Sequence, residues 1–345
     1  MTDATPTIVI FAGAPYHGVR RSARSISEAL ADLATVVYVD PSASSRGANG
    51  VVADPELTLT PEGVHHLGAV SLPAHTRPGM RTVTGRLMVR AASRAIDRIG
   101  ADRPTAVLLQ TPQRNVLGRL DEAVSVYWAT DLYAAGATLM GVDESTLSQA
   151  ERTSATNADL IVAVSPAIAE YWTEHHDRVV EVGHGVTRPV RDRTDRPADL
   201  PKATTLAAIV GTLSPRIDVD LVRAVADSGI EIALIGPLSL RDDRGGFDEL
   251  LARDDVHWLG AKPHAELGDY YAHIDVGLVP YTLSAFNRYA SPLKPLEYLA
   301  AGLPVVATPL PQIVALHSED VTIAEDATGF AEAAAAQARK RWNPE

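Results

Sequence analysis

The chain has no cysteine among its 345 residues, which excludes disulfides, thiolate metal ligands and cysteine nucleophiles. No apolar run approaches the ~18 to 20 residues that a membrane-spanning helix needs. The first residues, Met1 to Pro6, lack the basic and then apolar pattern of a signal peptide. These absences predict a cytoplasmic protein without a stable membrane anchor.

An overall basic charge is absent as well, since the formal net charge is −12. General nucleic-acid binding needs a basic surface, so we expect no nucleic-acid partner. Four arginines nevertheless recur at four-residue spacing in one helical stretch, from about Gly85 to Ile99: Arg86, Arg90, Arg94 and Arg98. This arginine stripe is either a solvated helix face or a contact for an anionic acceptor or a membrane surface.

The length of the chain suggests two domains, and apolar residues make up 46% of it, enough for a sizeable core. Short apolar strands alternate with helical patterns on both sides of a segment rich in Arg, Asp and Pro, which predicts two Rossmann-like α/β domains with parallel sheets. The polar segment itself is typical of an interdomain linker. The predicted boundaries are 1–186 for the first domain, 187–204 for the linker, 205–322 for the second domain and 323–345 for a C-terminal helix.

Residues 291–308 carry the strongest functional pattern, S-P-L-K-P-L-E-Y-L-A-A-G-L-P-V-V-A-T. Ser291 is typical of an N-cap and Pro292 of a first helical position, so a helix is predicted from there, followed by a buried strand. Lys294 adds a full charge to the positive helix N-terminus, and Glu297 shares its face. The pair is either an ordinary exposed ion pair or a nucleotide-sugar site, with phosphate on the lysine and a sugar hydroxyl on the glutamate.

The same segment resembles the donor-binding helix of the retaining GT-B glycosyltransferases of the large group-one superfamily, in a branch with a signature near S-P-L-K-x-x-E-Y-x-A-x-G-x-P-V-V-A. The resemblance implies two Rossmann-like domains facing across a cleft, with the donor mainly on the second and the acceptor mainly on the first. It allows the last helix to cross back to the first domain. It implies Ser291, Leu293 and Lys294 at the donor diphosphate and Glu297 at the ribose. Many members have a further glutamate near the transferred sugar, and Tyr289 stands in its place here.

Further candidates lie where ligands bind in parallel α/β sheets, at the carboxyl ends of the strands. In the second domain, Gly211 permits a close approach of the backbone and Arg216 is a second clamp for the diphosphate. Tyr281 is placed to line the base or the sugar. The remaining donor-side candidates are Thr212, beside Gly211, and Pro237, at a strand end suited to a nucleobase.

In the first domain, the loop A-G-A-P-Y-H-G-V-R-R after the first strand is not a G-x-G-x-x-G fingerprint, and neither domain has one. A nicotinamide dehydrogenase is therefore disfavoured. Tyr16, Gly18 and Arg20 are candidate contacts to the acceptor or sugar. His17 is a candidate catalytic group, with simple exposure in a loop as the alternative.

Two other residues have paired interpretations. Asp131, after a strand, either orients an acceptor hydroxyl as a catalytic group or caps a local turn; His184, between two glycines, either contacts the sugar or acceptor or belongs to a hinge. No cluster of His, Asp and Glu has metal-ligand spacing, and Asp218, which begins a D-x-D, is typical of a helix cap. We expect no metal, because the lysine and arginine of the donor site with a helix dipole can neutralise the leaving diphosphate.

The predicted function is a glycosyltransferase that moves a sugar from a nucleoside diphosphate sugar to an acceptor hydroxyl or amine, with retention. UDP or TDP is the expected donor nucleotide, and no cofactor is expected. The absence of an anchor favours a small molecule, such as a natural product, or a glycan as acceptor. The alternatives are a sugar-nucleotide epimerase of GT-B fold, which needs extra acid/base carboxylates, and a non-enzymatic two-lobed protein that binds a nucleotide or sugar.

Overall fold

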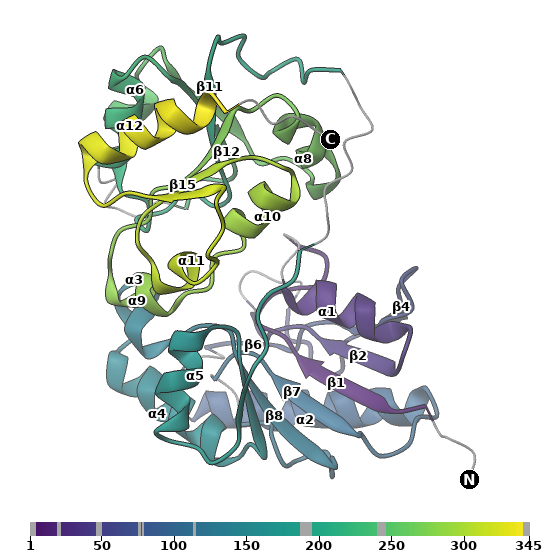
Figure 1. Cartoon of the computed structure of the whole chain (residues 1–345). Helices are drawn as coiled ribbons and strands as arrows, with labels where there is room; N and C mark the ends of the chain where they lie inside the picture. Colours follow the sequence, from purple (N-terminus) through teal and green to yellow (C-terminus); the bar gives the residue numbers. More distant parts are fainter. Residues whose placement is uncertain are drawn as a thin grey trace. The chain divides into compact units, whose positions relative to one another are not determined.

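The computed structural model describes residues 5–18, 22–45, 50–74, 77, 79–112, 115–186, 195–239 and 246–340. The chain divides into two compact units, Met1–Gly183 and His184–Glu345. Each unit contains a sheet of mostly or entirely parallel strands with helices packed against it (Figure 1). Mixed α/β architecture with parallel sheets is thus confirmed.

The first unit contains an eight-stranded sheet in the order β10-β9-β8-β7-β1-β2-β5-β4. Every neighbouring pair is parallel except β4 with β5. The central strands are near-continuous apolar runs, as expected for parallel strands covered on both faces. The strands are β1 Thr7–Phe11, β2 Thr35–Val39, β4 Leu57–Leu59, β5 His65–Leu67, β7 Ala106–Leu109, β8 Val124–Ala129, β9 Leu160–Ala163 and β10 Val179–Glu181, with a separate pair β3 Ala43–Ser44 and β6 Ser71–Leu72.

The helices of this unit begin at recognisable caps. Asp143 accepts the N–H of Thr146 at the start of α4, and Ser165 accepts that of Ile168 at the start of α5. The helix of the arginine stripe, α2, begins at Met80, earlier than the predicted start at Gly85. The helices are α1 Ser22–Ala31, α2 Met80–Arg98, η1 Ala134–Gly136, α3 Ala137–Met140, α4 Glu144–Thr156 and α5 Pro166–Thr173.

The second unit contains a six-stranded, fully parallel sheet in the order β13-β12-β11-β14-β15-β16. The strands are β11 Leu206–Val210, β12 Glu231–Ile235, β13 Val256–Gly260, β14 Val276–Val279, β15 Val305–Ala307 and β16 Val321–Ile323. The helices are α6 Val219–Asp227, α7 Phe247–Leu251, η2 His264–Glu266, α8 Leu267–Tyr271, α9 Ala285–Tyr289, α10 Lys294–Ala300, α11 Pro311–Val314 and α12 Ala327–Ala338.

Two hydrophobic cores cover this second sheet, one on each face. Alternate residues of β11 enter different cores, since Ala207 and Ile209 pack with α6 and α12 whereas Ala208 and Val210 pack with α8 and α10. This period of two is the normal consequence of strand geometry. Helix α10, which carries the strongest sequence motif, is therefore seated directly on the sheet.

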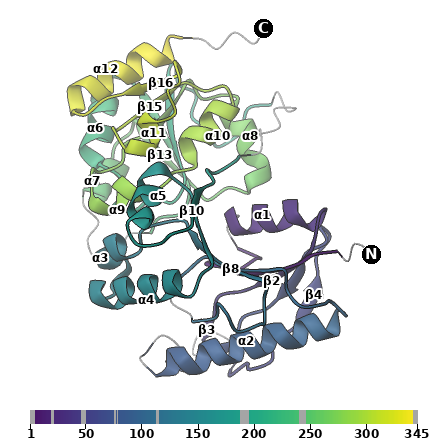
Figure 2. The same ribbon diagram turned by 60° about the horizontal axis from the view of Figure 1, so that its bottom comes forward.

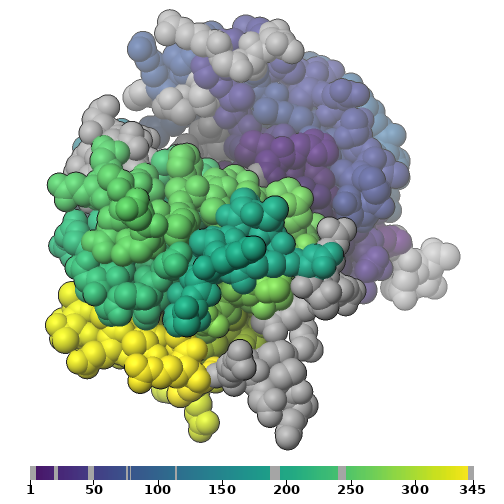
Figure 3. All heavy atoms as spheres, turned by 90° about the horizontal axis from the view of Figure 1, so that it is seen from above, coloured from purple at the N-terminus to yellow at the C-terminus, as the bar shows by residue number. Residues whose placement is uncertain are grey.

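The C-terminal helix α12 belongs to the second unit. Phe330 and Ala334 are fully buried in the same core as Val222 and Val225 of α6, and Figure 3 shows α12 in yellow on the surface of this unit. The prediction that the last helix crosses back to the first domain is therefore wrong for residues 327–340, because its apolar side chains fill the core beside α6. No helix in the described ranges is long and apolar enough to cross a membrane.

Candidate functional site

The motif helix α10 begins later than its sequence predicts. Its first residue is Lys294 and its N-cap is Leu293, which makes no side-chain capping hydrogen bond. The prediction of Ser291 as N-cap and Pro292 as first helical residue is therefore wrong. Pro295 occupies the first turn instead, where its missing N–H has no intrahelical partner to lose.

Lys294 and Glu297 form a largely buried ion pair on this first turn. The Nζ of Lys294 lies 2.5 Å from Oε2 of Glu297, and their side chains are only 22% and 15% exposed. The hydroxyl of Tyr271 donates to the same oxygen at 3.1 Å. The carboxylate is thus held from two sides, which is more than an ordinary solvated pair requires.

The loops after β11 and β12 approach each other as closely as their backbones allow. Gly236 has φ +153°, and a Cβ built on it would lie 1.8 Å from the carbonyl oxygen of Gly211. A Cβ on Gly211, at φ +136°, would lie 3.3 Å from Cε of Lys294, so the lysine stem covers this glycine. The N–H of Leu213 donates to the carbonyl of Pro237 at 2.9 Å. Only glycine fits at residue 236, and the close approach sets the floor of the site.

Arg216 is held in place by a buried side chain that sequence reasoning missed. Its Nε donates to Oδ1 of Asn287 at 2.6 Å, and its guanidinium lies 5.0 Å from the ring centroids of both Tyr281 and Phe286. Asn287 is fully buried, and its Nδ2 donates to the carbonyl of Thr282 at 2.8 Å. The arginine is therefore oriented by a hydrogen bond and two aromatic faces.

Tyr298 anchors α10 to the sheet on the side away from the ion pair. Its hydroxyl accepts the N–H of Val210 at 2.8 Å and donates to the carbonyl of Ala208 at 3.4 Å. A Cβ on Gly277 would lie 2.4 Å from the tyrosine ring, so only glycine leaves room for it. Burial raises the pKa of Tyr298 well above its ordinary value, which keeps the phenol neutral.

The second unit thus gathers many of the predicted donor-side residues at the carboxyl ends of β11, β12 and β14. Thr212 is exposed beside Gly211, Tyr289 is half-buried at the end of α9, and Ser291 and Leu293 directly precede α10. The residues joined by printed contacts or close approach are Gly211, Arg216, Pro237, Tyr281, Lys294 and Glu297. Two cations, the glycine backbone beside the lysine stem and one carboxylate suit a ligand that carries both anionic groups and hydroxyls.

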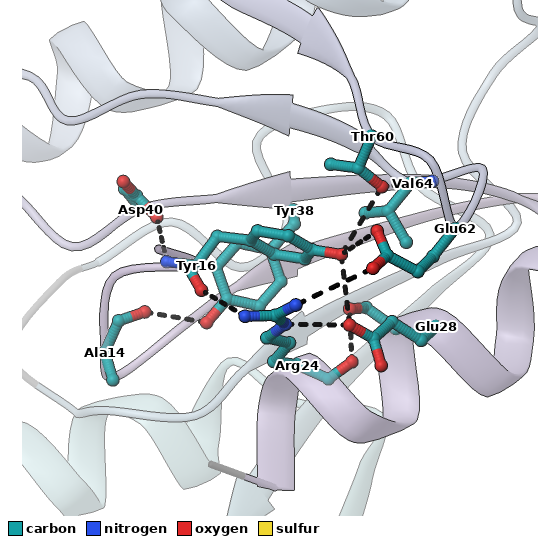
Figure 4. A network of polar contacts seen from close by, with 10 residues as sticks. Ala14, Tyr16, Arg24, Glu28, Tyr38, Asp40, Thr60, Glu62 and Val64 are labelled. Atoms are coloured by element: carbon teal, nitrogen blue, oxygen red, sulfur yellow. Dashed lines mark hydrogen bonds and ion pairs between the residues drawn. The ribbon is translucent and has the colours of Figure 1, made fainter. Parts of the chain in front are cut away.

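In the first unit, Tyr16 is a core residue rather than part of a surface. It is 1% exposed, and its N–H donates to Oδ1 of Asp40 at 2.8 Å. Its hydroxyl lies 3.2 Å from Glu28 and 3.3 Å from Glu62, beneath the guanidinium of Arg24 (Figure 4). Burial raises the pKa of this phenol. The structure gives Tyr16 a packing role, and its side chain is not available to an acceptor or sugar.

The neighbouring loop candidates lie at the surface. His17 and Gly18 are exposed, and the His17 ring packs edge-on against His66 with 4.8 Å between centroids. Nε2 of His66 lies 3.1 Å from Oδ2 of Asp40 without hydrogen-bond alignment. Arg20 lies outside the described residues. Among the loop candidates, His17 is therefore the side chain that the structure leaves accessible.

Asp131, which is half-buried, lies near a buried carboxylate that the sequence did not reveal. Glu151, on α4, is 3% exposed and accepts the N–H groups of Tyr133 at 2.8 Å and Ala134 at 2.9 Å. Burial raises its pKa to about 7, more than those hydrogen bonds lower it. Glu151 thereby fixes the loop that follows Asp131. The sequence indicates the burial of Glu151 only through its spacing, since it lies one turn from Leu147 on the buried face of α4.

The remaining site predictions concern His184 and metal ions. His184 is half-buried, and burial lowers the pKa of its imidazole. Asp218 is the N-cap of α6, as predicted, and accepts the N–H groups of Asp220 and Leu221. Within the described parts of the chain, no three His, Asp or Glu side chains are grouped to hold a metal ion.

Two α/β units with parallel sheets match the architecture of the GT-B class of fold, and solved structures with this fold are similar over nearly the whole chain. Residues 215–339 match the family model for glycosyl transferases group 1. This range includes Arg216, Tyr281, Lys294 and Glu297. The sequence match with that family is thus confined to the second unit.

Comparison with named proteins gives one match in sequence and several in fold. Over 104 residues the chain is 36% identical to a protein named for a glycosyltransferase of teichuronic acid biosynthesis, TuaH of Bacillus subtilis (strain 168); the match covers 30% of this chain and about a quarter (26%) of that relative. The structure is similar to Anabaena HepE in complex with UDP and glucose, at TM-score 0.65 and 15% identity over 96% of this chain and 89% of that one. It is also similar to a UDP-forming trehalose-phosphate synthase of Burkholderia xenovorans in complex with glucose-6-phosphate, at TM-score 0.63 and 12% identity over 98% and 93%.

Proposed function

We propose that this chain is a glycosyltransferase that transfers a sugar from a UDP-sugar to an acceptor hydroxyl, with UDP as the leaving group. The observation that carries the proposal is the constellation on the second unit, in which Lys294 lies over Gly211 and is paired with a doubly held Glu297. The presence of UDP in the structure of HepE supports UDP over TDP as the nucleotide.

Each residue has a role that follows from its surroundings. Lys294 and the backbone at Gly211 receive the diphosphate, and Arg216, oriented by Asn287, supplies a second positive charge. Oε2 of Glu297 already accepts from Lys294 and Tyr271, so Oε1 is the oxygen left for a ribose hydroxyl. The two cations stabilise the charge that develops on the leaving diphosphate.

The proposal includes retention of configuration and independence from metal ions. Two cationic side chains at the diphosphate supply the charge stabilisation that a metal provides elsewhere. We further propose residues 1–186 as the acceptor domain and 205–322 as the donor domain, with 187–204 as linker, and a cytoplasmic location. The relative named for teichuronic acid biosynthesis supports a glycan as acceptor, rather than a small molecule such as a natural product.

A titration of UDP, TDP, GDP and ADP into wild type and Lys294→Ala, with and without EDTA, tests the donor site. A charge-assisted phosphate contact is worth ~1.5 to 3 kcal/mol, so the variant should bind UDP more than tenfold more weakly. Lys202→Ala is the matched control, because Lys202 is an exposed lysine of the same unit. Equal UDP affinity in Lys294→Ala and wild type, or no nucleotide binding at all, contradicts the proposal.

Product analysis tests the chemistry. With a UDP-sugar and a set of acceptor sugars, NMR of the product should show the donor's anomeric configuration retained, and the rate should be unchanged by EDTA. An inverted product, or a rate abolished by EDTA and restored by a divalent ion, contradicts this part of the proposal without affecting the donor site.

A further inference from the structure

A separate pocket lies wholly within the first unit. It has a volume of about 320 Å³ and lies between the start of α2, the loop that follows β7, and α4. Figure 2 shows α2 and α4 along the lower edge of this unit. The pocket includes Leu109 and Pro112, at and just beyond the carboxyl end of β7, where ligands enter parallel α/β sheets.

The lining combines an apolar floor with a rim of hydroxyl and amide groups. Leu109, Val116 and Leu117 are buried and form the apolar part. The polar side chains are Thr82, Asn115, Ser145, Thr146, Gln149, Thr153, Ser154 and Asn157. The described lining residues include no aromatic ring, so they offer no stacking surface for a nucleobase. Hydroxyls and amides around an apolar patch suit a sugar ring, which has polar edges and apolar faces.

Two arginines give the pocket its charge. Arg81 comes from α2 and Arg119 from the loop after β7, and no carboxylate is among the lining residues that the structure describes. Neither guanidinium has an ion-pair or hydrogen-bond partner within the described residues, whereas Arg94 and Arg98 of the arginine stripe are both paired with Asp54. Both arginines line one polar pocket in a chain of net charge −12.

The nearest acidic cap does not cancel this charge from inside the pocket. Asp143 begins α4 but is not a lining residue, and its Oδ1 already accepts from Ser145 at 2.6 Å and from the N–H of Thr146 at 3.0 Å. The pocket is therefore lined by two arginines, Arg81 and Arg119, that have no ion-pair partner among the described residues, and by hydroxyl and amide side chains.

We propose that this pocket binds an acidic sugar unit, one that carries a carboxylate or a phosphate, as part of the acceptor. The role as an acceptor subsite rests on the proposed transferase function, whereas binding of the acidic sugar rests on the pocket alone. A volume near 300 Å³ is at the small end of ligand pockets and suits one or two sugar rings. Arg81 and Arg119 hold the anionic group, and the rim residues hold the ring hydroxyls.

Calorimetric titration of the intact chain with four probes tests this proposal: D-glucuronate, glucose 6-phosphate, inorganic phosphate and D-glucose. The variants are Arg81→Gln and Arg119→Gln, with Arg90→Gln as control, since Arg90 is exposed on the same helix and does not line the pocket. Gln149→Trp is a fourth variant, which fills the pocket without changing its charge. UDP is titrated into every variant in parallel.

The expected result is binding of glucuronate or glucose 6-phosphate, whichever anion the pocket prefers, at least tenfold weaker in both arginine variants and in Gln149→Trp. Arg90→Gln should match wild type, and glucose should bind at least tenfold more weakly than the preferred acid. The proposal is overturned if neither acid binds, if the pocket variants leave binding unchanged, or if inorganic phosphate binds as tightly as both sugars. The pocket variants are also expected to bind UDP with unchanged affinity. If UDP binds to none of the proteins, the transferase proposal is contradicted, whereas the titrations with the sugar acids still test whether the pocket binds an acidic sugar.

Discussion

Replacing Asn287 with alanine should damage both the stability of the second unit and its affinity for UDP. Asn287 is fully buried and makes contacts in two directions. Its Oδ1 accepts from Nε of Arg216 at 2.6 Å, and its Nδ2 donates to the carbonyls of Thr282 at 2.8 Å and Arg216 at 3.3 Å. Alanine removes all of these contacts and leaves two carbonyl groups without this donor.

The size of the effect follows from the partners. A hydrogen bond to a charged group is worth ~1.5 to 3 kcal/mol and each of the two neutral ones ~1 kcal/mol, so the free energy of unfolding should fall by about 3.5 to 5 kcal/mol. For a unit of this size, each kcal/mol lowers Tm by ~2 to 4 °C. Arg216 also loses the hydrogen bond that orients it, and UDP affinity should fall by about tenfold, since ~1.4 kcal/mol corresponds to that factor.

Urea unfolding and UDP titration of Asn287→Ala, beside Ser284→Ala, separate the two effects. Ser284 is the N-cap of α9 and accepts the N–H of Asn287, so its alanine variant weakens the same helix by ~1 kcal/mol but keeps the contact with Arg216. Ser284→Ala should retain wild-type affinity for UDP. If Asn287→Ala is destabilised and yet binds UDP as wild type does, Asn287 only supports the fold and Arg216 is not a diphosphate clamp.

Three further predictions concern buried groups. Gly236→Ala should destabilise the second unit by more than ~3 kcal/mol, because its Cβ would overlap the carbonyl of Gly211, whereas Gly229→Ala, at φ +85° with open space around it, should cost only ~1 kcal/mol in urea unfolding. Burial raises the pKa of Glu151 to about 7, so the folded protein holds the proton of this carboxyl more tightly than the unfolded chain does. As pH rises from about 4.5 to 7, the free energy of unfolding of wild type should therefore fall by up to ~3 kcal/mol relative to that of Glu151→Gln. A difference between the two proteins that does not change with pH in urea unfolding contradicts this prediction. Tyr298→Phe should lower the free energy of unfolding by ~1 to 3 kcal/mol, since a buried strand N–H loses its acceptor, and unchanged stability would show that this N–H finds another partner.

Much of the fold follows from local sequence. The predicted alternation of short apolar strands and helices is present in both units, as β14 and β15 of the second unit and α4 of the first unit illustrate. Buried parallel strands are continuous apolar runs, and caps such as Asp143 act within one turn, so short windows contain the information. The start of α10 was misplaced because two prolines three residues apart both suit a first turn, and local preference does not choose between them.

The supporting residues of the site could not be predicted, because their partners are distant in sequence. Asn287 bonds Arg216 from 71 residues away, and Tyr298 bonds Val210 from 88 residues away. A single asparagine or tyrosine carries no pattern that reveals such a partner. Tyr16 shows the converse, since its loop suggested an accessible contact and the fold buried its ring. Lys294 and Glu297 were predictable as a pair because they share one helical turn.

The neighbouring residues Glu297 and Tyr298 give α10 two roles, and this has a consequence for engineering the donor preference. The short helix α10 carries both Glu297, whose carboxylate is proposed to bind a nucleotide, and Tyr298, whose phenol packs against β11 and β14. Gly277 of β14 has no side chain, which leaves room for the phenol ring. Random mutagenesis of α10 will therefore recover few active variants, since most changes in its tilt alter the sheet as well. Altered donor preference should instead arise from substitutions at the exposed residues just before α9, such as Leu283, which can vary without moving α10.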